Sequence, residues 1–145
     1  MVKLTRDSRT RSAEVDEVSL RDGQIRLLWT LVGTDTDRAV LLLMARGRGH
    51  CEMRLPAVPT GDQFQIRLRL ESLATARTAH QWIWDLYVDP RTGEEPLRLG
   101  RHPDGATGRQ DIIDGPSQHA AGAVVEPYFT IKKNLSLRCT RGRVC

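Results

Sequence analysis

Asp85 and Arg98 are the side chains in this sequence whose types and positions most clearly require a partner. The segment 81–89 reads QWIWDLYVD, and in a strand its alternate residues face opposite sides. A carboxylate among large apolar neighbours is costly unless it is paired. Arg98, on the following segment 96–101, is the expected partner of Asp85, and such a pair sets strand register more than it adds stability. One side of 81–89 must face a core; the side without Asp85 consists of Trp82, Trp84, Leu86 and Val88.

Two further charged residues, Arg67 and Arg69, alternate with apolar residues in the segment 63–70, which reads QFQIRLRL. This alternation predicts a half-buried strand with both arginines on its outward face. Adjacent guanidinium groups on one face can bind an anionic polymer. A solvated sheet face has the same pattern, so both interpretations stay open.

Catalytic and cofactor motifs are missing from the sequence: it contains no nucleophile elbow, phosphate-binding loop, dinucleotide fingerprint or zinc-protease motif. We therefore expect no catalytic residues, no cofactor and no metal site. One alternative stays open, a small β-barrel or sandwich enzyme or ligand carrier with residues 102–123 as a lid. That segment holds the residues that could in principle bind a metal, although without the usual ligand spacing: His102, Asp104, Asp111, Asp114 and His119.

Composition narrows the choice of compartment and partner. The chain has 145 residues, a net charge of +4 and three cysteines. It has no apolar run long enough to span a membrane and no signal peptide pattern, so a cytoplasmic location with free thiols is expected. Much of the basic excess lies at the two ends, aromatics are few and no nucleic-acid motif occurs, which disfavours nucleic acid as a partner.

Short alternating runs separated by turn residues occupy most of the chain. Asp22-Gly23 is a strong hairpin signal, because both residues tolerate positive φ. Pro56 and Pro59 are expected to end a strand, and residues 71–80 can form only a short helical turn. The expected strands cover 15–20, 24–32, 38–46, 50–55, 63–70, 81–89, 96–101, 124–131 and 134–139. About eight or nine strands at this spacing predict an all-β fold, an immunoglobulin-like antiparallel β-sandwich with one short helical turn.

The expected domain organisation is a single sandwich between two polar ends. Residues 1–12 form a basic arm that we expect to be flexible, residues 13–139 form the sandwich, and residues 140–145 form a flexible tail. Residues 102–123 are expected to be a long polar connection within the sandwich.

The last third of the chain contains motifs that occur together in a known family. They are Trp84-Asp85-Leu86-Tyr87-Val88, Arg98-Leu99-Gly100, Pro127-Tyr128-Phe129-Thr130 and Lys132-Lys133-Asn134-Leu135-Ser136-Leu137. This set resembles the immunoglobulin-like accessory domain appended to bacterial family 2 glycosyltransferases and teichoic-acid glycerophosphotransferases. In that family a glycine usually precedes the Asn-Leu-Ser, where this sequence has Lys133.

The resemblance implies a non-catalytic accessory module in a glycosyltransferase-type pathway. Such a module would bind a carbohydrate or an anionic polymer, or mediate assembly with a transferase partner or with itself. Exposed aromatics such as Trp29 or Trp82 would add contacts, whereas the Tyr128 ring is also expected to fit a core position with its hydroxyl bonded to backbone. The candidate binding residues are Arg67, Arg69, Trp82, Asp85, Arg98, Tyr128, Lys132 and Asn134.

Overall fold

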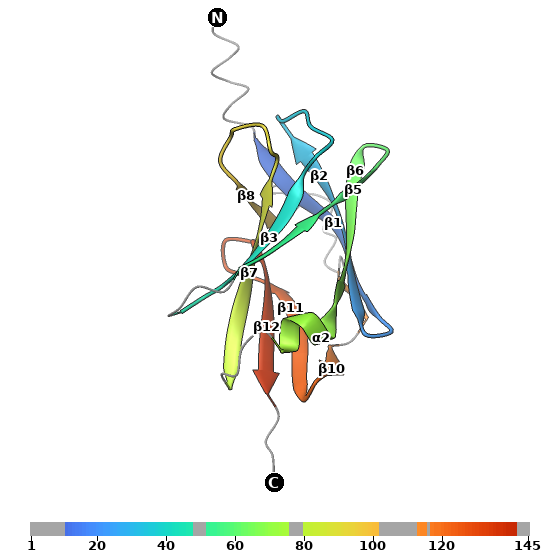
Figure 1. Cartoon of the computed structure of the whole chain (residues 1–145), viewed down its shortest axis with the longest axis vertical. Helices are drawn as coiled ribbons and strands as arrows, with labels where there is room; N and C mark the ends of the chain where they lie inside the picture. Colours follow the sequence, from blue (N-terminus) through green and yellow to red (C-terminus); the bar gives the residue numbers. More distant parts are fainter. Residues whose placement is uncertain (1–10, 48–51, 76–79, 102–112, 116, 142–145) are drawn as a thin grey trace, which may run out of the picture.

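The chain folds as an immunoglobulin-like all-β sandwich with one short helix, which confirms the predicted fold class. Two layers of strands enclose a hydrophobic core (Figure 1). No helix among the described residues is both long enough and apolar enough to cross a membrane. The computed structural model describes residues 11–47, 52–75, 80–101, 113–115 and 117–141.

Layer A carries the candidate site on its outer face. Its strands are β1 (Ser12–Arg21), β2 (Gln24–Val32), β5 (Val58–Thr60), β6 (Gln63–Arg69) and β9 (Ile113–Asp114). They lie in the order β5-β6-β2-β1-β9, and all pairs are antiparallel except β1 with β9, which is parallel.

Layer B covers the other side of the core. Its strands are β3 (Val40–Ala45), β4 (Glu52–Pro56), β7 (Gln81–Asp89), β10 (Gln118–Ala120), β11 (Ala123–Phe129) and β12 (Leu135–Arg141). They lie in the order β4-β3-β7-β12-β11-β10, all antiparallel. A further strand, β8 (Leu97–Gly100), joins the layers because it pairs antiparallel with β7 and parallel with β1.

The sandwich differs from the expected one in strand number and in two pairings. The described residues form twelve strands rather than eight or nine, because β5, β9 and β10 are short additional strands. Two of these, β9 and β10, lie within the segment 102–123 that was expected to be a connection. Residues 102–112 and 116, which belong to the expected lid, lie outside the described residues. The parallel pairs of β1 with β8 and β9 correct the expectation of a purely antiparallel sandwich.

The fourth strand ends at Pro56, as expected, but Pro59 does not interrupt strand structure. Pro56 is the last residue of β4, and Pro59 lies inside β5. Among the described residues β4 pairs only with β3 and β5 only with β6, so both are edge strands. An edge strand tolerates proline because one side of its backbone needs no hydrogen-bond partner in the sheet.

A β-bulge in β1 sets which of its side chains face outward. The register with β2 shifts between Val15 and Glu17, so Asp16 is an extra residue on β1. Val15 and Val18 are both buried although they are three residues apart, which strict alternation does not allow. Because of the bulge, Val18 faces the core, and Glu17, Ser19 and Arg21 lie on the outward side of β1.

The core is built from the inward sides of both layers. In layer A, Trp29 stacks on Phe64 with ring centroids 6.0 Å apart. In layer B, the inward side of β7 consists of Trp82, Trp84, Leu86 and Val88, all buried. The expectation that Trp29 or Trp82 is exposed is therefore wrong, since their exposed fractions are 0% and 4%. Alternation alone does not say which side of a strand faces the core.

The short helix α2 (Leu70–Ala74) closes one end of the core. Leu70, Leu73 and Ala74 are buried, and the indole Nε1 of Trp84 donates a hydrogen bond to the carbonyl oxygen of Leu73 over 3.4 Å. This helix is the one short helical turn expected within 71–80, although it begins at Leu70; residues 76–79 lie outside the described part of the chain.

Strand structure extends slightly beyond the expected sandwich bounds of 13 and 139. β1 begins at Ser12 and β12 ends at Arg141. The rest of the expected arm and tail, residues 1–10 and 142–145, lie outside the described residues.

Candidate functional site

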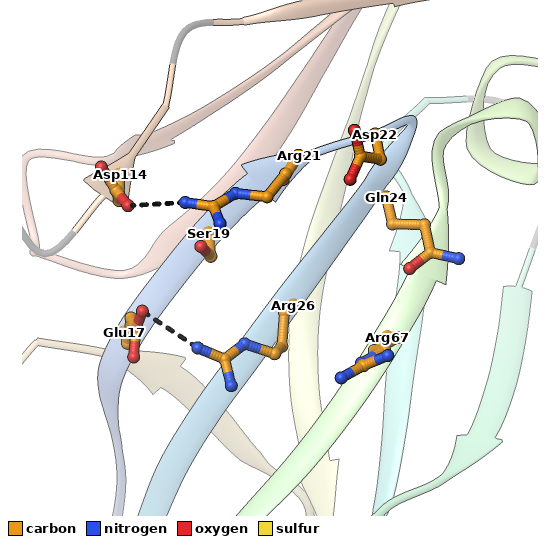
Figure 2. Close-up of a pocket in the computed structure, with 8 residues that line it drawn as sticks. All are labelled: Glu17, Ser19, Arg21, Asp22, Gln24, Arg26, Arg67 and Asp114. Atoms are coloured by element: carbon orange, nitrogen blue, oxygen red, sulfur yellow. Dashed lines mark hydrogen bonds and ion pairs between the residues drawn. The ribbon is translucent and has the colours of Figure 1, made fainter.

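A groove on the outer face of layer A is the candidate functional site (Figure 2). It has a volume of about 320 Å³ and crosses β1, β2 and β6 near the β1–β2 turn, with β9 at one side. We call it the arginine groove. The residues that line it are Glu17, Ser19, Arg21, Asp22, Gln24, Arg26, Arg67 and Asp114.

Strand pairing brings several arginines together in this groove. Arg26 on β2 lies directly opposite Arg67 on β6, and Gln24 lies opposite Arg69. Arg67 and Arg69 are exposed, which confirms that they share the outward face of β6. Like charges directly opposite each other destabilise an antiparallel pair. A bound group with hydrogen-bond acceptors would relieve this repulsion.

Carboxylates on β1 and β9 neutralise two of the arginines. The Arg26 Nη2 lies 3.2 Å from the Glu17 Oε2, and the Arg21 Nη2 lies 4.0 Å from the Asp114 Oδ2 (Figure 2). By contrast, Arg67 forms no hydrogen bond or ion pair with any residue that the structure describes. Its guanidinium group can therefore bind a ligand without giving up a contact of the protein.

The groove presents donors and acceptors side by side. Its lining includes three arginines and three carboxylates, so its formal charge balances, and Gln24 and Ser19 add neutral polar groups. Arginine supplies only donors, carboxylates only acceptors, and the amide and hydroxyl supply both. Vicinal hydroxyl groups of a sugar both donate and accept, and such a mixed lining can bind them. A ligand that carries only negative charges would be attracted by the arginines but repelled by Glu17, Asp22 and Asp114.

A second polar cluster lies on the outer face of layer B around Asp85. The Asp85 carboxylate accepts hydrogen bonds from Arg46 Nε over 2.8 Å, Arg46 Nη2 over 3.0 Å and Ser136 Oγ over 2.8 Å. Arg98 Nη2 lies 3.4 Å from Asp85 Oδ1, which confirms the pairing predicted from the sequence. Arg98 also donates to the carbonyl oxygens of Leu86 and Leu135, so it ties β8 to both β7 and β12.

The surroundings of Asp85 act on its pKa in opposite directions. Burial raises the pKa of Asp85, but hydrogen bonds from Arg46 and Ser136 and the positive charges of Arg98 and Arg46 lower it more. The pKa of Asp85 therefore lies below its usual range. The residue stays ionised at neutral pH and serves as a fixed counter-charge, whereas a general acid or base needs a pKa near the working pH.

Tyr128 lies on the same outer face. It is half-buried and pairs across the strands with Ser136, and the guanidinium carbon of Arg138 lies 4.4 Å from the centre of its ring. The interpretation of Tyr128 as a core ring is therefore wrong. The preceding residue, Pro127, is buried, so the odd-numbered residues of β11 face the core. Tyr128, at an even-numbered position, therefore lies on the other side of the strand.

Lys132 and Asn134 lie at the tip of the hairpin between β11 and β12, beside β8. The backbone N–H of Arg101 donates to the carbonyl oxygen of Lys133 over 2.9 Å, and Gly100 forms a β-bridge with Asn134. A Cβ atom on Gly100 would lie 2.7 Å from the Lys133 carbonyl oxygen and 3.0 Å from the Asn134 Oδ1. Glycine at position 100 is therefore what allows the hairpin tip to approach β8 so closely.

Replacing Gly100 by alanine is expected to destabilise this contact. The added methyl group would meet backbone atoms that cannot move independently, and overpacking of this kind costs about 1–3 kcal/mol of unfolding free energy. Chemical denaturation measures the loss. Hydrogen exchange of the Arg101 amide, which should become faster in the variant, locates it. An unchanged denaturation midpoint and unchanged Arg101 exchange would contradict the close approach.

The structure thus distributes the candidate residues over five places instead of one. Arg67 lines the arginine groove, and Arg69 lies in an adjoining depression that shares Asp22 and Gln24 with it. Trp82 belongs to the core. The remaining candidates lie on the outer face of layer B or at the hairpin tip: Asp85, Arg98, Tyr128, Lys132 and Asn134.

Sequence reasoning missed Arg26 and Arg46. Alternation in 24–32 places Arg26 on the outward side of its strand, but only the pairing of β2 with β6 brings it opposite Arg67. Arg46 follows β3, and its backbone N–H donates to the carbonyl oxygen of Ile83 on β7 over 2.9 Å, which brings its side chain to Asp85. Both positions depend on which strands are neighbours.

The described residues offer no cluster of three or more side chains suited to a metal ion. Of the residues that could in principle form such a cluster, His102, Asp104 and Asp111 lie outside the described part of the chain. Cys139 is a free, fully buried thiol, and burial raises its pKa to about 11. A thiol with this pKa is almost entirely protonated at neutral pH and is a poor nucleophile.

No protein-family model matches the chain, and no curated protein matches it significantly. Among solved structures, the fold is similar to part of S. aureus TarS, a teichoic-acid glycosyltransferase, with a TM-score of 0.62 and 19% identity. The match covers 92% of this chain and 25% of that protein. A structure of S. aureus TarS 217–571 matches with a TM-score of 0.64 and 19% identity, over 93% of this chain and 40% of the other. The resemblance to domains appended to such transferases is thereby confirmed at the level of fold.

Proposed function

We propose that this chain is a non-catalytic accessory module that binds a carbohydrate polymer in the arginine groove and presents it to a glycosyltransferase partner in the cytoplasm. One observation carries the proposal: the exposed Arg67 lies opposite Arg26 in a groove of balanced charge, without a partner among the described residues. The similarity in fold to part of a teichoic-acid glycosyltransferase supports the kind of pathway.

The composition of the groove favours sugar over other ligands. Its volume of about 320 Å³ lies at the lower end of the range of about 300–1,000 Å³ for small-molecule pockets. It could therefore hold a short part of a chain whose remainder continues over the exposed sheet. Glu17 pairs with Arg26, and Asp114 pairs with Arg21. The arginines keep both carboxylates in the groove, where their oxygens can accept hydrogen bonds from the hydroxyl groups of a sugar.

The test is a double substitution, Arg67→Ala with Arg69→Ala, measured by biolayer interferometry on an immobilised, sugar-bearing teichoic acid. We expect affinity to fall by about tenfold or more, because hydrogen bonds from charged donors contribute about 1.5–3 kcal/mol. The thermal unfolding midpoint should change little, because both side chains are exposed.

A matched control removes two exposed arginines outside the groove, Arg38→Ala with Arg91→Ala. Both double variants lose the same charge, so a general electrostatic attraction would weaken equally in the two. Unchanged affinity in the Arg67/Arg69 variant, or an equal loss in the control, would remove the arginine groove from the proposed function. A sugar-free polymer of the same backbone, run in parallel, should bind the groove variant and the wild type alike.

A further inference from the structure

A separate cavity of about 460 Å³ lies between β8, the start of β1 and the β11–β12 hairpin tip. We call it the hairpin-tip pocket. Four cationic side chains line it, Arg98, Arg101, Lys132 and Lys133, against a single carboxylate, Glu14. The arginine groove has balanced charge, whereas the lining of this pocket has a formal excess of three positive charges (four cations minus one carboxylate), or of two once Asp85, the partner of Arg98, is counted. Its electrostatics therefore suit an anion.

Hydrogen bonds within the hairpin tip and to Arg101 hold the tip in place. Lys133 N–H donates to the Thr130 carbonyl oxygen and Thr130 N–H to the Asn134 carbonyl oxygen, each over 2.8 Å. Asn134 N–H donates to the Thr130 Oγ1 over 3.2 Å, and Arg101 N–H to the Lys133 carbonyl oxygen over 2.9 Å. The backbone that carries both lysines is thus fixed to β8 before any ligand binds. A pre-organised site loses less conformational freedom on binding.

Lys133 has a backbone conformation that disfavours its own side chain. Its φ is +65°, in the left-handed region where glycine is preferred over residues with a Cβ atom. A strained residue of this kind is an observation from which a functional role can be inferred. Glycine at position 133 would fit the turn better, but it would remove a charge from the pocket.

The two lysines are available for a ligand, whereas the arginines are partly engaged. Lys132 and Lys133 are exposed, and neither side chain has a partner among the residues described. Arg98 is held by its contacts with Asp85 and with backbone carbonyl oxygens, so it contributes mainly its charge. The Arg101 guanidinium lies 5.3 Å from the centre of the Phe129 ring, which positions it at the wall of the pocket.

We propose that the hairpin-tip pocket binds a phosphate group of a soluble phosphate-bearing ligand, with Lys132 and Lys133 as its main contacts and Arg101 and Arg98 supporting the charge. Ammonium and guanidinium groups are the side chains that bind phosphate best. This site is distinct from the arginine groove and does not depend on the function proposed for that groove.

The experiment is a titration of the ¹⁵N-labelled chain with pyrophosphate, followed by amide chemical shifts in NMR. We expect saturable shifts that centre on residues 100–101 and 131–134. Lys133→Gly should weaken pyrophosphate binding at least about fivefold while the melting temperature stays equal or rises, because the glycine relieves the backbone strain. Lys132→Ala should weaken binding to a similar extent.

Arg91→Gly is the matched control. Arg91 is also an exposed cation with a positive φ, +62°, but it lies in the turn after β7, outside the pocket. Its replacement removes one charge and relieves the same kind of strain, so it should leave pyrophosphate affinity unchanged. An equal loss of affinity in Arg91→Gly and Lys133→Gly, or no loss in Lys133→Gly, would overturn the proposal.

A second arm separates a soluble phosphate from a lipid headgroup. Ile131, at the rim of the pocket, is 100% exposed and would insert into a membrane surface if the true ligand were a lipid. Phosphatidylglycerol vesicles are therefore tested by co-sedimentation with the wild type and with Ile131→Ser. Binding to vesicles that Ile131→Ser abolishes, without saturable pyrophosphate shifts, would overturn a soluble ligand. Retained pyrophosphate binding in the Arg67/Arg69 double variant would confirm that the two sites are separate.

Discussion

Replacing Trp84 by alanine is expected to lower the free energy of unfolding by about 3–5 kcal/mol, a larger loss than we expect for Asp85→Asn or Gly100→Ala. Trp84 is fully buried at the centre of β7 between the two layers. Its indole also donates a hydrogen bond to the Leu73 carbonyl oxygen and so connects the sheet to α2. Because small domains are stable by only about 5–15 kcal/mol, this loss removes a large share of the stability of the folded state. Urea denaturation followed by circular dichroism measures the change.

Trp84→Phe separates the packing of the ring from its hydrogen bond. Phenylalanine keeps a large aromatic side chain in the core but leaves the Leu73 carbonyl oxygen without the indole donor. We expect a loss of about 1–3 kcal/mol, which combines an unsatisfied buried acceptor with a small cavity. A loss as large as that of Trp84→Ala would mean that the connection to α2, rather than the volume of the side chain, dominates.

The second large effect is expected for Asp85→Asn. Arg98, whose side chain is only 22% exposed, would lose the counter-charge of Asp85, and Arg46 would lose a bidentate partner. Breaking a fully buried pair costs about 3–5 kcal/mol. Because Arg46 is half-exposed, we expect about 2–3 kcal/mol here. Equilibrium denaturation at pH 7 measures the loss, and a loss below about 0.5 kcal/mol, as for a surface pair, would contradict a structural role.

Dependence on pH provides an independent check of the Asp85 network. The pKa of Asp85 is lowered in the folded state relative to about 3.9 in the unfolded chain. Its contribution to stability is therefore fully present above pH 4 and is lost as pH falls through the folded-state pKa. The difference in unfolding free energy between the wild type and Asp85→Asn should be constant from pH 5 to pH 7 and shrink below pH 4. A difference that does not change with pH would mean that the carboxylate charge contributes nothing.

Much of the fold can be predicted from local patterns. β2 and β7 have the bounds expected from alternation, and the Asp22-Gly23 turn adopts the positive φ values that its residues allow, 54° and 76°. The bulge at Asp16 could not be predicted, because it depends on the register between β1 and β2. The short strands β5, β9 and β10 also lack a local signal. Each of them pairs with a longer strand, β6, β1 or β11, so its place depends on that neighbour.

The candidate sites also contain some features that local patterns predict and others that depend on tertiary contacts. The pairing of Asp85 with Arg98 was predictable, because a carboxylate between apolar residues needs a partner and the next strand supplied an arginine. Whether Trp82 and Tyr128 face the core could not be predicted, because alternation assigns residues to two sides of a strand without saying which side is inside. Lys133 could be located at a turn from the sequence, but its positive φ and its closeness to Arg101 required the structure.

The sequence by itself therefore determined the longer strands, the all-β class and the outward position of Arg67 and Arg69. These properties depend on neighbours within a few residues along the chain. The tertiary structure decided which strands pair, and through pairing it placed Arg26 opposite Arg67, Arg46 beside Asp85 and the lysines beside β8. The physical reason is that a site on a sheet is assembled across strands, and the pairing of distant strands is determined by how their apolar sides fit into one shared core.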